Sequence, residues 1–180
     1  MLSRSDALLV LVDFQVKLLP FTWDAEGVTS RSARLIQGAK LLQLPILVTE
    51  QYPQGLGATD PRLVAALGEA YRPLVKTTMS CLGDAPFREA LQAVRRRQVI
   101  LSGIEAHVCV HQTAVDLVEA GYEVHVAGDC VSSRRERDVE LALRRMAQTG
   151  CRISTHEMAI FEVLRVSGTP EFKEWIRIVR

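Results

Sequence analysis

Three polar residues of the sequence have side chains that together could perform covalent catalysis. Asp13 directly follows six apolar residues, Lys76 ends a short apolar run, and Cys109 follows the segment SGIEAHV. A thiolate is a strong nucleophile, a carboxylate can accept its proton, and an ammonium group can orient that carboxylate. If the fold brings the three together, we expect Lys76 to lower the pKa of both Asp13 and Cys109. We also expect Cys109 to lie at the start of a helix, where the backbone dipole favours a thiolate.

Each of these residues also has a purely structural interpretation. Asp13 could cap a helix or form a salt bridge in a turn, Lys76 could be an exposed lysine, and Cys109 could be a small buried apolar residue. We interpret the remaining cysteines in that last way: Cys81, Cys130 and Cys151.

Other arrangements that could support catalysis are not evident. His107 and His111 flank Cys109, but residues two apart on a helix do not face each other, so we expect no Cys–His pair. The cysteines and histidines lack the spacing of a metal site, and we expect neither a metal nor a cofactor. The Gly55-Leu56-Gly57 segment lacks the third glycine of a dinucleotide-binding loop and does not follow the first strand.

The elements that must position these side chains are visible as short apolar runs alternating with amphipathic stretches. Strands buried on both faces of a parallel sheet have this pattern. Helices are expected to start at Asp60-Pro61 and at Thr169-Pro170, where a capping residue precedes a proline. The sequence predicts one α/β domain, residues 1–180, with a three-layer α/β/α architecture, a Rossmann-like six-stranded parallel sheet and strand order 3-2-1-4-5-6. The predicted strands are Ala7–Val12, Ile46–Thr49, Leu74–Lys76, Gln98–Ser102, Glu123–Ala127 and Arg152–Thr155.

This topology predicts where a ligand would bind. In open parallel sheets, ligands bind at the carboxyl ends of the strands, where the strand order reverses. Asp13 and Lys76 end predicted strands, and Cys109 lies a few residues beyond another, so we expect the three to converge there. The loop Glu50–Thr59 should border the site. As substrate-binding wall residues we predict Phe14, Gln51, Tyr52 and Met79.

Composition excludes several classes of protein. Lysine and arginine total 22 and aspartate and glutamate 21, a net charge of +1, so we expect no nucleic-acid partner. The longest purely apolar run, Ala7–Val12, has six residues, far fewer than a membrane span of about 20. We therefore expect no membrane partner and a cytoplasmic location, where the cysteines would be reduced. The basic run Arg95–Arg97 is interpreted as a solvated helix end.

Several segments resemble those of a known family. Asp13 in VDFQ, Lys76 in VKTTMSC and Cys109 in SGIEAHVCV are similar to the Asp-Lys-Cys triad of isochorismatase-like cysteine hydrolases, in particular the branch of isochorismatase domain-containing proteins. The segments VTEQYPQGLG, GDCVSSR and THEMAIFEVL match as well, so the resemblance runs from about Leu9 to Leu164.

The resemblance implies a hydrolase that uses Cys109 as nucleophile, Asp13 as proton acceptor and Lys76 to orient Asp13. It implies a cis peptide bond between Ile104 and Glu105, an oxyanion hole formed by the backbone N–H groups of Glu105 and Cys109, and homo-oligomers of two or more chains. A thiol nucleophile favours a small amide or related acyl substrate and a thioester intermediate. Nicotinamidase-type relatives carry a metal site between the acid and the lysine, but no histidine lies between Asp13 and Lys76 here.

Two other functions remain open. The chain could be a non-catalytic interaction protein that retains the fold and the triad. It could also be a redox-responsive protein in which Cys81 and Cys109 form a disulfide on oxidation.

Overall fold

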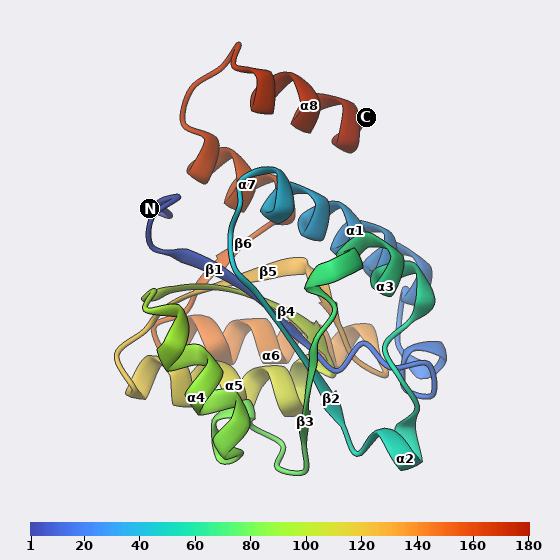
Figure 1. Ribbon diagram of the computed structural model, residues 1–180. Helices are drawn as coiled ribbons and strands as arrows, with labels where there is room; N and C mark the ends of the chain where they lie inside the picture. Colours follow the sequence, from blue (N-terminus) through green and yellow to red (C-terminus); the bar gives the residue numbers. More distant parts are fainter.

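The computed structural model of the chain describes residues 1–180 and has one six-stranded, all-parallel sheet (Figure 1). The strand order is β3-β2-β1-β4-β5-β6, as the sequence predicts. The strands are β1 (Ala7–Val12), β2 (Ile46–Gln51), β3 (Pro73–Lys76), β4 (Gln98–Ile104), β5 (Glu123–Ser132) and β6 (Arg152–Ser154).

Helices cover both faces of this sheet. On one face lie α1 (Ala25–Leu41), α3 (Pro61–Leu67), α7 (His156–Leu164) and α8 (Pro170–Val179); on the other lie α4 (Ala85–Val94), α5 (His111–Glu119) and α6 (Glu136–Gln148) (Figure 1). The four-residue helix α2 (Pro53–Leu56) and four short helical turns lie in connections: η1 (Leu19–Phe21), η2 (Gly68–Ala70), η3 (Cys81–Gly83) and η4 (Ala106–Val110). The predicted helix starts are confirmed, because Asp60 and Thr169 accept hydrogen bonds from backbone N–H groups of α3 and α8.

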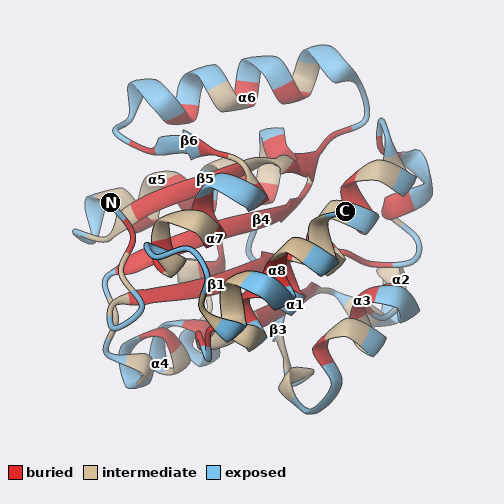
Figure 2. Cartoon of the chain, turned by 90° about the horizontal axis from the view of Figure 1, so that it is seen from above, coloured by how far each residue is buried: buried red, intermediate tan, exposed pale blue.

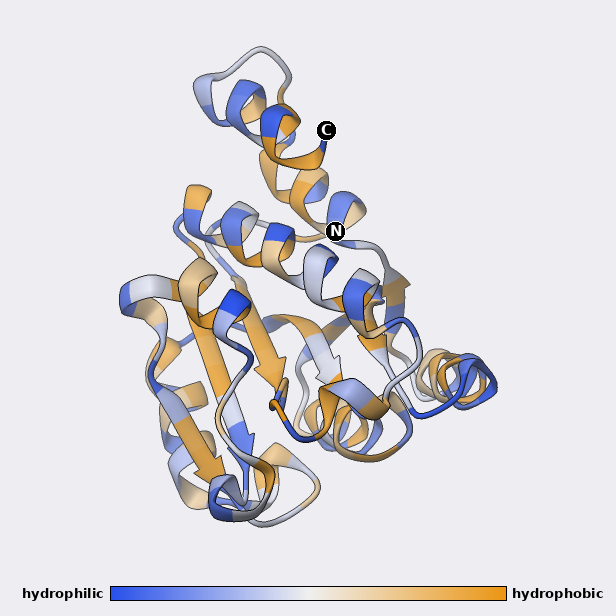
Figure 3. Ribbon diagram, turned by 90° about the vertical axis from the view of Figure 1, so that its right-hand side faces the viewer, coloured by the Kyte–Doolittle hydropathy of each residue, from blue (hydrophilic) through white to orange (hydrophobic).

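The sheet separates two apolar cores. Alternate residues of β1 belong to different cores: Leu9 and Leu11 pack toward α1, Leu8 and Val10 toward α4 and α5. The central strands are buried throughout, and hydrophilic residues gather on the outer faces of the helices (Figures 2 and 3). This two-sided burial explains why the strands read as unbroken apolar runs rather than as alternating patterns.

The C-terminal helix α8 packs onto the domain. Trp175 is fully buried and lies edge-on to both His156 and Phe161 of α7. None of the helices combines the length and apolar character that crossing a bilayer requires.

A glycine permits the close approach of the central strands at the edge where the polar residues gather. Gly103 of β4 pairs with Val12 of β1 and has a φ of 153°. A Cβ at this position would lie 2.5 Å from the carbonyl oxygen of Val12, so no larger residue fits without displacing backbone. The ends of β1 and β4 therefore lie against each other just before Asp13 and the turn that carries Cys109.

Candidate active site

Asp13 lies at the end of β1 with its side chain completely buried. Its backbone has left-handed dihedrals (φ 53°), so the chain turns sharply there. One carboxylate oxygen, Oδ1, accepts a hydrogen bond from the Thr49 hydroxyl at 2.7 Å. The other, Oδ2, lies 2.7 Å from the Lys76 ammonium nitrogen. Thr49 is on β2 and Lys76 on β3, so three neighbouring strands position this carboxylate.

Lys76 is buried rather than exposed, with 1% of its side chain accessible. Besides Asp13, its Nζ contacts Gln51 Oε1 at 2.5 Å and the carbonyl oxygens of Thr78 and Met79 at 3.1 Å each. This acceptor shell, together with the charge of Asp13, replaces the water that the ammonium loses on burial. Burial alone would lower the pKa of Lys76, but the negative charges nearby outweigh it and raise the pKa. Lys76 is therefore a fixed cation.

Cys109 lies in the π-helical turn η4, immediately before α5, and is 7% exposed. Its sulfur is 4.0 Å from the sulfur of Met79. Burial, followed by the negative charge of Asp13, raises the pKa of the thiol to about 12. Lys76 lowers this pKa, but by less.

Lys76 lowers the pKa of both Asp13 and Cys109, as expected, but the net shift of both groups is upward. Burial raises the pKa of Asp13 by more than Lys76 lowers it, and the thiol of Cys109 is also harder to ionise than usual. The physical reason is that one cation serves two acidic groups in a dry site. Asp13 as carboxylate neutralises Lys76, so ionising Cys109 as well would leave an excess negative charge. The resting site therefore holds a neutral thiol beside an ion pair.

A cavity of about 310 Å³ opens onto Cys109. Its wall includes three of the four residues predicted for it, Gln51, Tyr52 and Met79. Phe14, the fourth, does not line it: the turn at Asp13 directs Phe14 into the core beside α1, where it is 2% exposed. Besides Cys109, the remaining lining residues are Glu105 and four that the sequence pattern does not single out: Leu18, Leu56, Val108 and Arg134. Leu56 belongs to the loop that was expected to border the site.

The segment between β4 and Cys109 is held by its own backbone and by the residues after β5. The peptide bond between Ile104 and Glu105 is cis. The Glu105 carbonyl accepts hydrogen bonds from the N–H groups of Val108 (3.0 Å) and Val110 (3.3 Å), on either side of Cys109. His107 contacts the Ser133 hydroxyl twice: its backbone N–H donates to the hydroxyl at 3.2 Å, and its ring Nδ1 lies 2.9 Å from the same oxygen. His107 thus supports this turn and is not among the cavity's lining residues.

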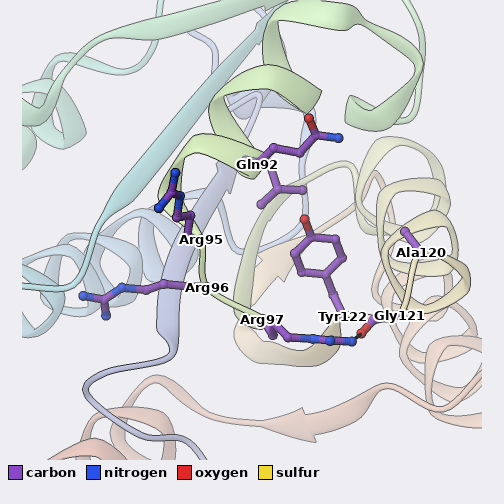
Figure 4. A pocket seen from close by; sticks show the side chains of 8 residues that line it. Gln92, Arg95, Arg96, Arg97, Ala120, Gly121 and Tyr122 are labelled. Atoms are coloured by element: carbon purple, nitrogen blue, oxygen red, sulfur yellow. Dashed lines mark hydrogen bonds between the residues drawn. The ribbon is translucent and has the colours of Figure 1, made fainter.

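A second cavity, of about 390 Å³, lies at the opposite edge of the sheet, by the start of β4 (Figure 4). It is lined by Leu91, Gln92, Arg95, Arg96, Arg97, Ala120, Gly121 and Tyr122. Arg96 donates to the carbonyls of Arg4 and Ala7, and Arg97 to that of Gly121. The interpretation of this run as a solvated helix end is therefore incomplete, because Arg96 and Arg97 bind carbonyl groups just before and at the start of β1 and in the turn after α5 rather than those of α4.

One other group of side chains could offer ligand atoms to a metal ion. Atoms of Asp129, Cys130 and His156 lie within 4.8 Å of one another. Both carboxylate oxygens of Asp129 are already used: one accepts from the His156 backbone N–H at 2.9 Å and the other contacts His156 Nδ1 at 2.5 Å. Cys130 packs in the core beside α1, whereas Cys109 packs in the core beside α5. We assign this group to holding the start of α7 on β5.

Comparisons with known proteins agree with this architecture. Residues 7–158 match the family model described as Isochorismatase domain. A Danio rerio protein named isochorismatase domain-containing protein 2 is 39% identical over 173 residues, which cover 96% of this chain and 86% of that protein.

Solved structures are similar over nearly the whole chain. One is described as MAR1 ribonuclease from Caenorhabditis elegans, with 38% identity, a TM-score of 0.91 and coverage of 99% of this chain and 91% of that one. Another is the YcaC gene product of Escherichia coli, described as an octameric hydrolase of unknown specificity, with 26% identity, a TM-score of 0.88 and coverage of 99% and 86%. The chain belongs to the isochorismatase family.

Proposed function

We propose that the chain is a cysteine hydrolase that cleaves a small amide, or a related acyl compound, through a thioester on Cys109. The observation that carries the proposal is the contact between Lys76 and Asp13 (2.7 Å), with Asp13 acting in turn on a thiol that lines a cavity. A carboxylate of raised pKa is a better base than an ordinary one, and burial gives Asp13 that property.

In the first half of the proposed reaction, Asp13 takes the proton of Cys109 as the sulfur attacks the acyl carbon. The proton transfer moves the negative charge from Asp13 to the sulfur, and the attack passes it on to the carbonyl oxygen of the substrate, so the total charge does not change. The carbonyl oxygen of the substrate becomes an oxyanion, which the backbone N–H groups of Glu105 and Cys109 stabilise. Such donors contribute about 3–4 kcal/mol each to the transition state.

In the second half, protonated Asp13 gives its proton to the leaving amine as the carbon–nitrogen bond breaks. The product is a thioester on Cys109 and a free amine or ammonia. Asp13 then takes a proton from water, whose oxygen attacks the thioester carbon. The carbon–sulfur bond then breaks, Asp13 returns the proton to the sulfur, the carboxylic acid leaves and Cys109 is restored as a thiol.

A direct test is to follow ammonia release from a panel of small primary amides and to look for the intermediate. We expect turnover of at least one amide, and we expect rapid acid quenching to trap an enzyme whose mass has grown by the acyl group on Cys109. Cys109→Ala should lose both signals and keep its fold, because it removes a single side-chain atom at the border between the cavity and the core beside α5. Ammonia release by Cys109→Ala at the wild-type rate would contradict the proposal. Absence of turnover, together with an unreactive Cys109, would favour a non-catalytic protein.

A second candidate reaction is RNA cleavage, because the Caenorhabditis elegans protein with 38% identity is described as a ribonuclease. We favour the amide because the cavity wall is mainly apolar and its two charged side chains, Glu105 and Arg134, are paired with each other. A phosphodiester would bring negative charge that this wall does not match. RNA cleavage that survives purification, and that Cys109→Ala abolishes, would reverse this preference.

We further propose that the chain forms a homo-oligomer of two or more copies. Phe21 and Trp23, just beyond Leu18 of the cavity wall, are 75% and 43% exposed, a large apolar area for an isolated chain. The octameric state described for the Escherichia coli relative agrees with self-association. Light scattering should give a mass that is a multiple of 20.0 kDa. A single-chain mass at micromolar concentration would contradict this.

The four cysteines are all unpaired, which fits the reducing conditions of the cytoplasm that we propose as the location.

A further inference from the structure

The cavity beside Cys109 carries two charged side chains in its wall, Glu105 and Arg134. The other lining residues are uncharged. Behind the thiol, Asp13 and Lys76 form a buried pair whose charges cancel. The charge that a bound substrate meets in the wall is therefore decided by Glu105 and Arg134.

These two side chains pair with each other. Arg134 Nε donates to Glu105 Oε1 at 2.8 Å and Arg134 Nη2 to Glu105 Oε2 at 3.3 Å, a two-point contact between planar groups. Only 11% of the Glu105 side chain is exposed, compared with 69% of the Arg134 side chain. A carboxylate that faces the cavity is thus neutralised by a guanidinium group that reaches in from solvent.

The pair also joins two segments of the site. Glu105 begins the turn that carries Cys109, and Arg134 follows β5 directly after Ser133, which contacts His107 of the same turn. Arg134 is therefore held near Glu105 by its backbone as well as by charge. We therefore expect Arg134 to stay paired with Glu105 rather than to leave it and bind an anionic substrate.

We infer that Arg134 cancels the charge of Glu105 so that the site accepts uncharged amides with an apolar acyl part and discriminates against charged ones. The inference rests on the proposed hydrolase function and specifies its substrate class. Leu18, Leu56 and Val108 supply the apolar contacts for the acyl part. Removing the charge of either residue would leave the other unpaired, give the cavity wall a net charge and change which substrates the site prefers.

The charge of the wall can be read without turnover by alkylating Cys109 with two reagents of nearly equal size, neutral iodoacetamide and anionic iodoacetate. The measured quantity is the ratio of the iodoacetate rate to the iodoacetamide rate, with the labelling of Cys109→Ala subtracted. Glu105→Gln leaves the guanidinium group unpaired and should raise the ratio roughly fivefold. Arg134→Gln leaves the carboxylate unpaired and should lower it by a similar factor. The double variant should return to within about twofold of the wild type.

The hydrolytic readout uses butyramide, succinamate and β-alaninamide, which are neutral, anionic and cationic. The wild type and the double variant should prefer butyramide in kcat/KM, whereas Glu105→Gln should gain on succinamate and Arg134→Gln on β-alaninamide. Arg135→Gln is the matched control, because Arg135 is the exposed neighbour of Arg134 and does not line the cavity. It should leave both readouts unchanged.

The two proposals fail in different ways. A wild type that prefers succinamate, or alkylation ratios that do not respond to either variant, would overturn the inference even if amides are hydrolysed. Shifted alkylation ratios without hydrolysis of any amide would overturn the proposed function and leave the charge balance of the wall supported.

Discussion

Replacing Asp13 with asparagine is expected to lower hydrolysis by at least about 10³-fold while making Cys109 more reactive toward iodoacetamide at neutral pH. Loss of the base accounts for the first effect, since an amide cannot take the thiol proton. The second effect follows from the charge of the cluster. Asp13 is the principal charge that raises the pKa of Cys109. Without it, a thiolate becomes the sole counter-ion of Lys76.

The size of the second effect can be bounded. With a pKa of about 12, only a minute fraction of Cys109 is thiolate at neutral pH. Without Asp13 the pKa should fall from about 12 toward the ordinary thiol value of 9.0 and stay above it, because burial raises this pKa by more than Lys76 lowers it; the thiolate fraction at neutral pH then rises by at most about 10³-fold. Lys76 should keep its proton in Asp13→Asn, because Gln51 Oε1 and the carbonyls of Thr78 and Met79 still accept from it.

The measurement is the pH profile of iodoacetamide labelling at Cys109, alongside ammonia release. Asp13→Asn should shift the midpoint of labelling to lower pH. Asp6→Asn is a suitable control because Asp6 precedes the same strand at its opposite end, where it accepts from the Arg97 backbone N–H. It should change neither readout. If Asp13→Asn slows alkylation in parallel with hydrolysis, the negative charge of Asp13 does not raise the pKa of Cys109.

The sequence predicts the placement of the site well because that placement depends on topology. Apolar runs buried on both faces indicate parallel strands, and parallel strands place the residues that follow them at one edge. Asp13 and Lys76 are found there for that reason, and so are Gln51 and Tyr52 of the wall. The strand order places β1 next to β4. It is predicted because the order 3-2-1-4-5-6 is common among parallel sheets of this kind, and no single residue indicates it.

The direction of the pKa shifts could not be predicted from the sequence in the same way. It depends on how much water remains around each group, and the sequence shows which charges meet but not how dry their surroundings are. Arg134 was missed for a different reason. The predicted strand ended at Ala127, but β5 continues to Ser132 through a register shift against β4. That irregularity brings Arg134 to the cavity.

Phe14 shows a third limit. The position of Phe14 next to the end of a predicted strand suggests that it faces the site, but Asp13 adopts a left-handed conformation and the chain turns Phe14 into the core. The Phe14 carbonyl accepts a hydrogen bond from the Asp60 N–H, which ties the turn to the start of α3. A single residue with positive φ is hard to foresee when it is not glycine.

Replacing Lys76 with methionine is expected to abolish turnover and to destabilise the fold in a pH-dependent way. Methionine is close to lysine in length and keeps the packing, but it leaves the carboxylate of Asp13 buried without a cation. Breaking a buried pair on one side costs about 3–5 kcal/mol. Part of this cost is avoided when Asp13 takes up a proton.

The sign of the pH dependence follows from the pKa of Asp13. Burial already raises the pKa of Asp13 in the wild type. Removing Lys76 takes away the charge that lowers this pKa most. A group whose pKa is higher in the folded than in the unfolded state stabilises the fold below the unfolded value, about 3.9 for aspartate, and this stabilisation is lost as the pH rises through the folded-state pKa. Lys76→Met should therefore be nearly as stable as the wild type in acid and progressively less stable toward neutral pH.

Urea unfolding of Lys76→Met across the acid-to-neutral range measures this deficit, and the double variant Asp13→Asn with Lys76→Met identifies its cause. The double variant has no charge at either position. The difference between its free energy of unfolding and that of the wild type should therefore change little over this pH range. At neutral pH, the double variant should have a higher free energy of unfolding than Lys76→Met. It should remain inactive, because it lacks both the base and the cation. Two results would contradict this explanation: a loss of stability in Lys76→Met that does not depend on pH, or one that the added Asp13→Asn substitution does not reduce. Either would mean that Lys76 stabilises the fold through its packing and its contacts with Gln51, Thr78 and Met79 rather than through the charge of Asp13.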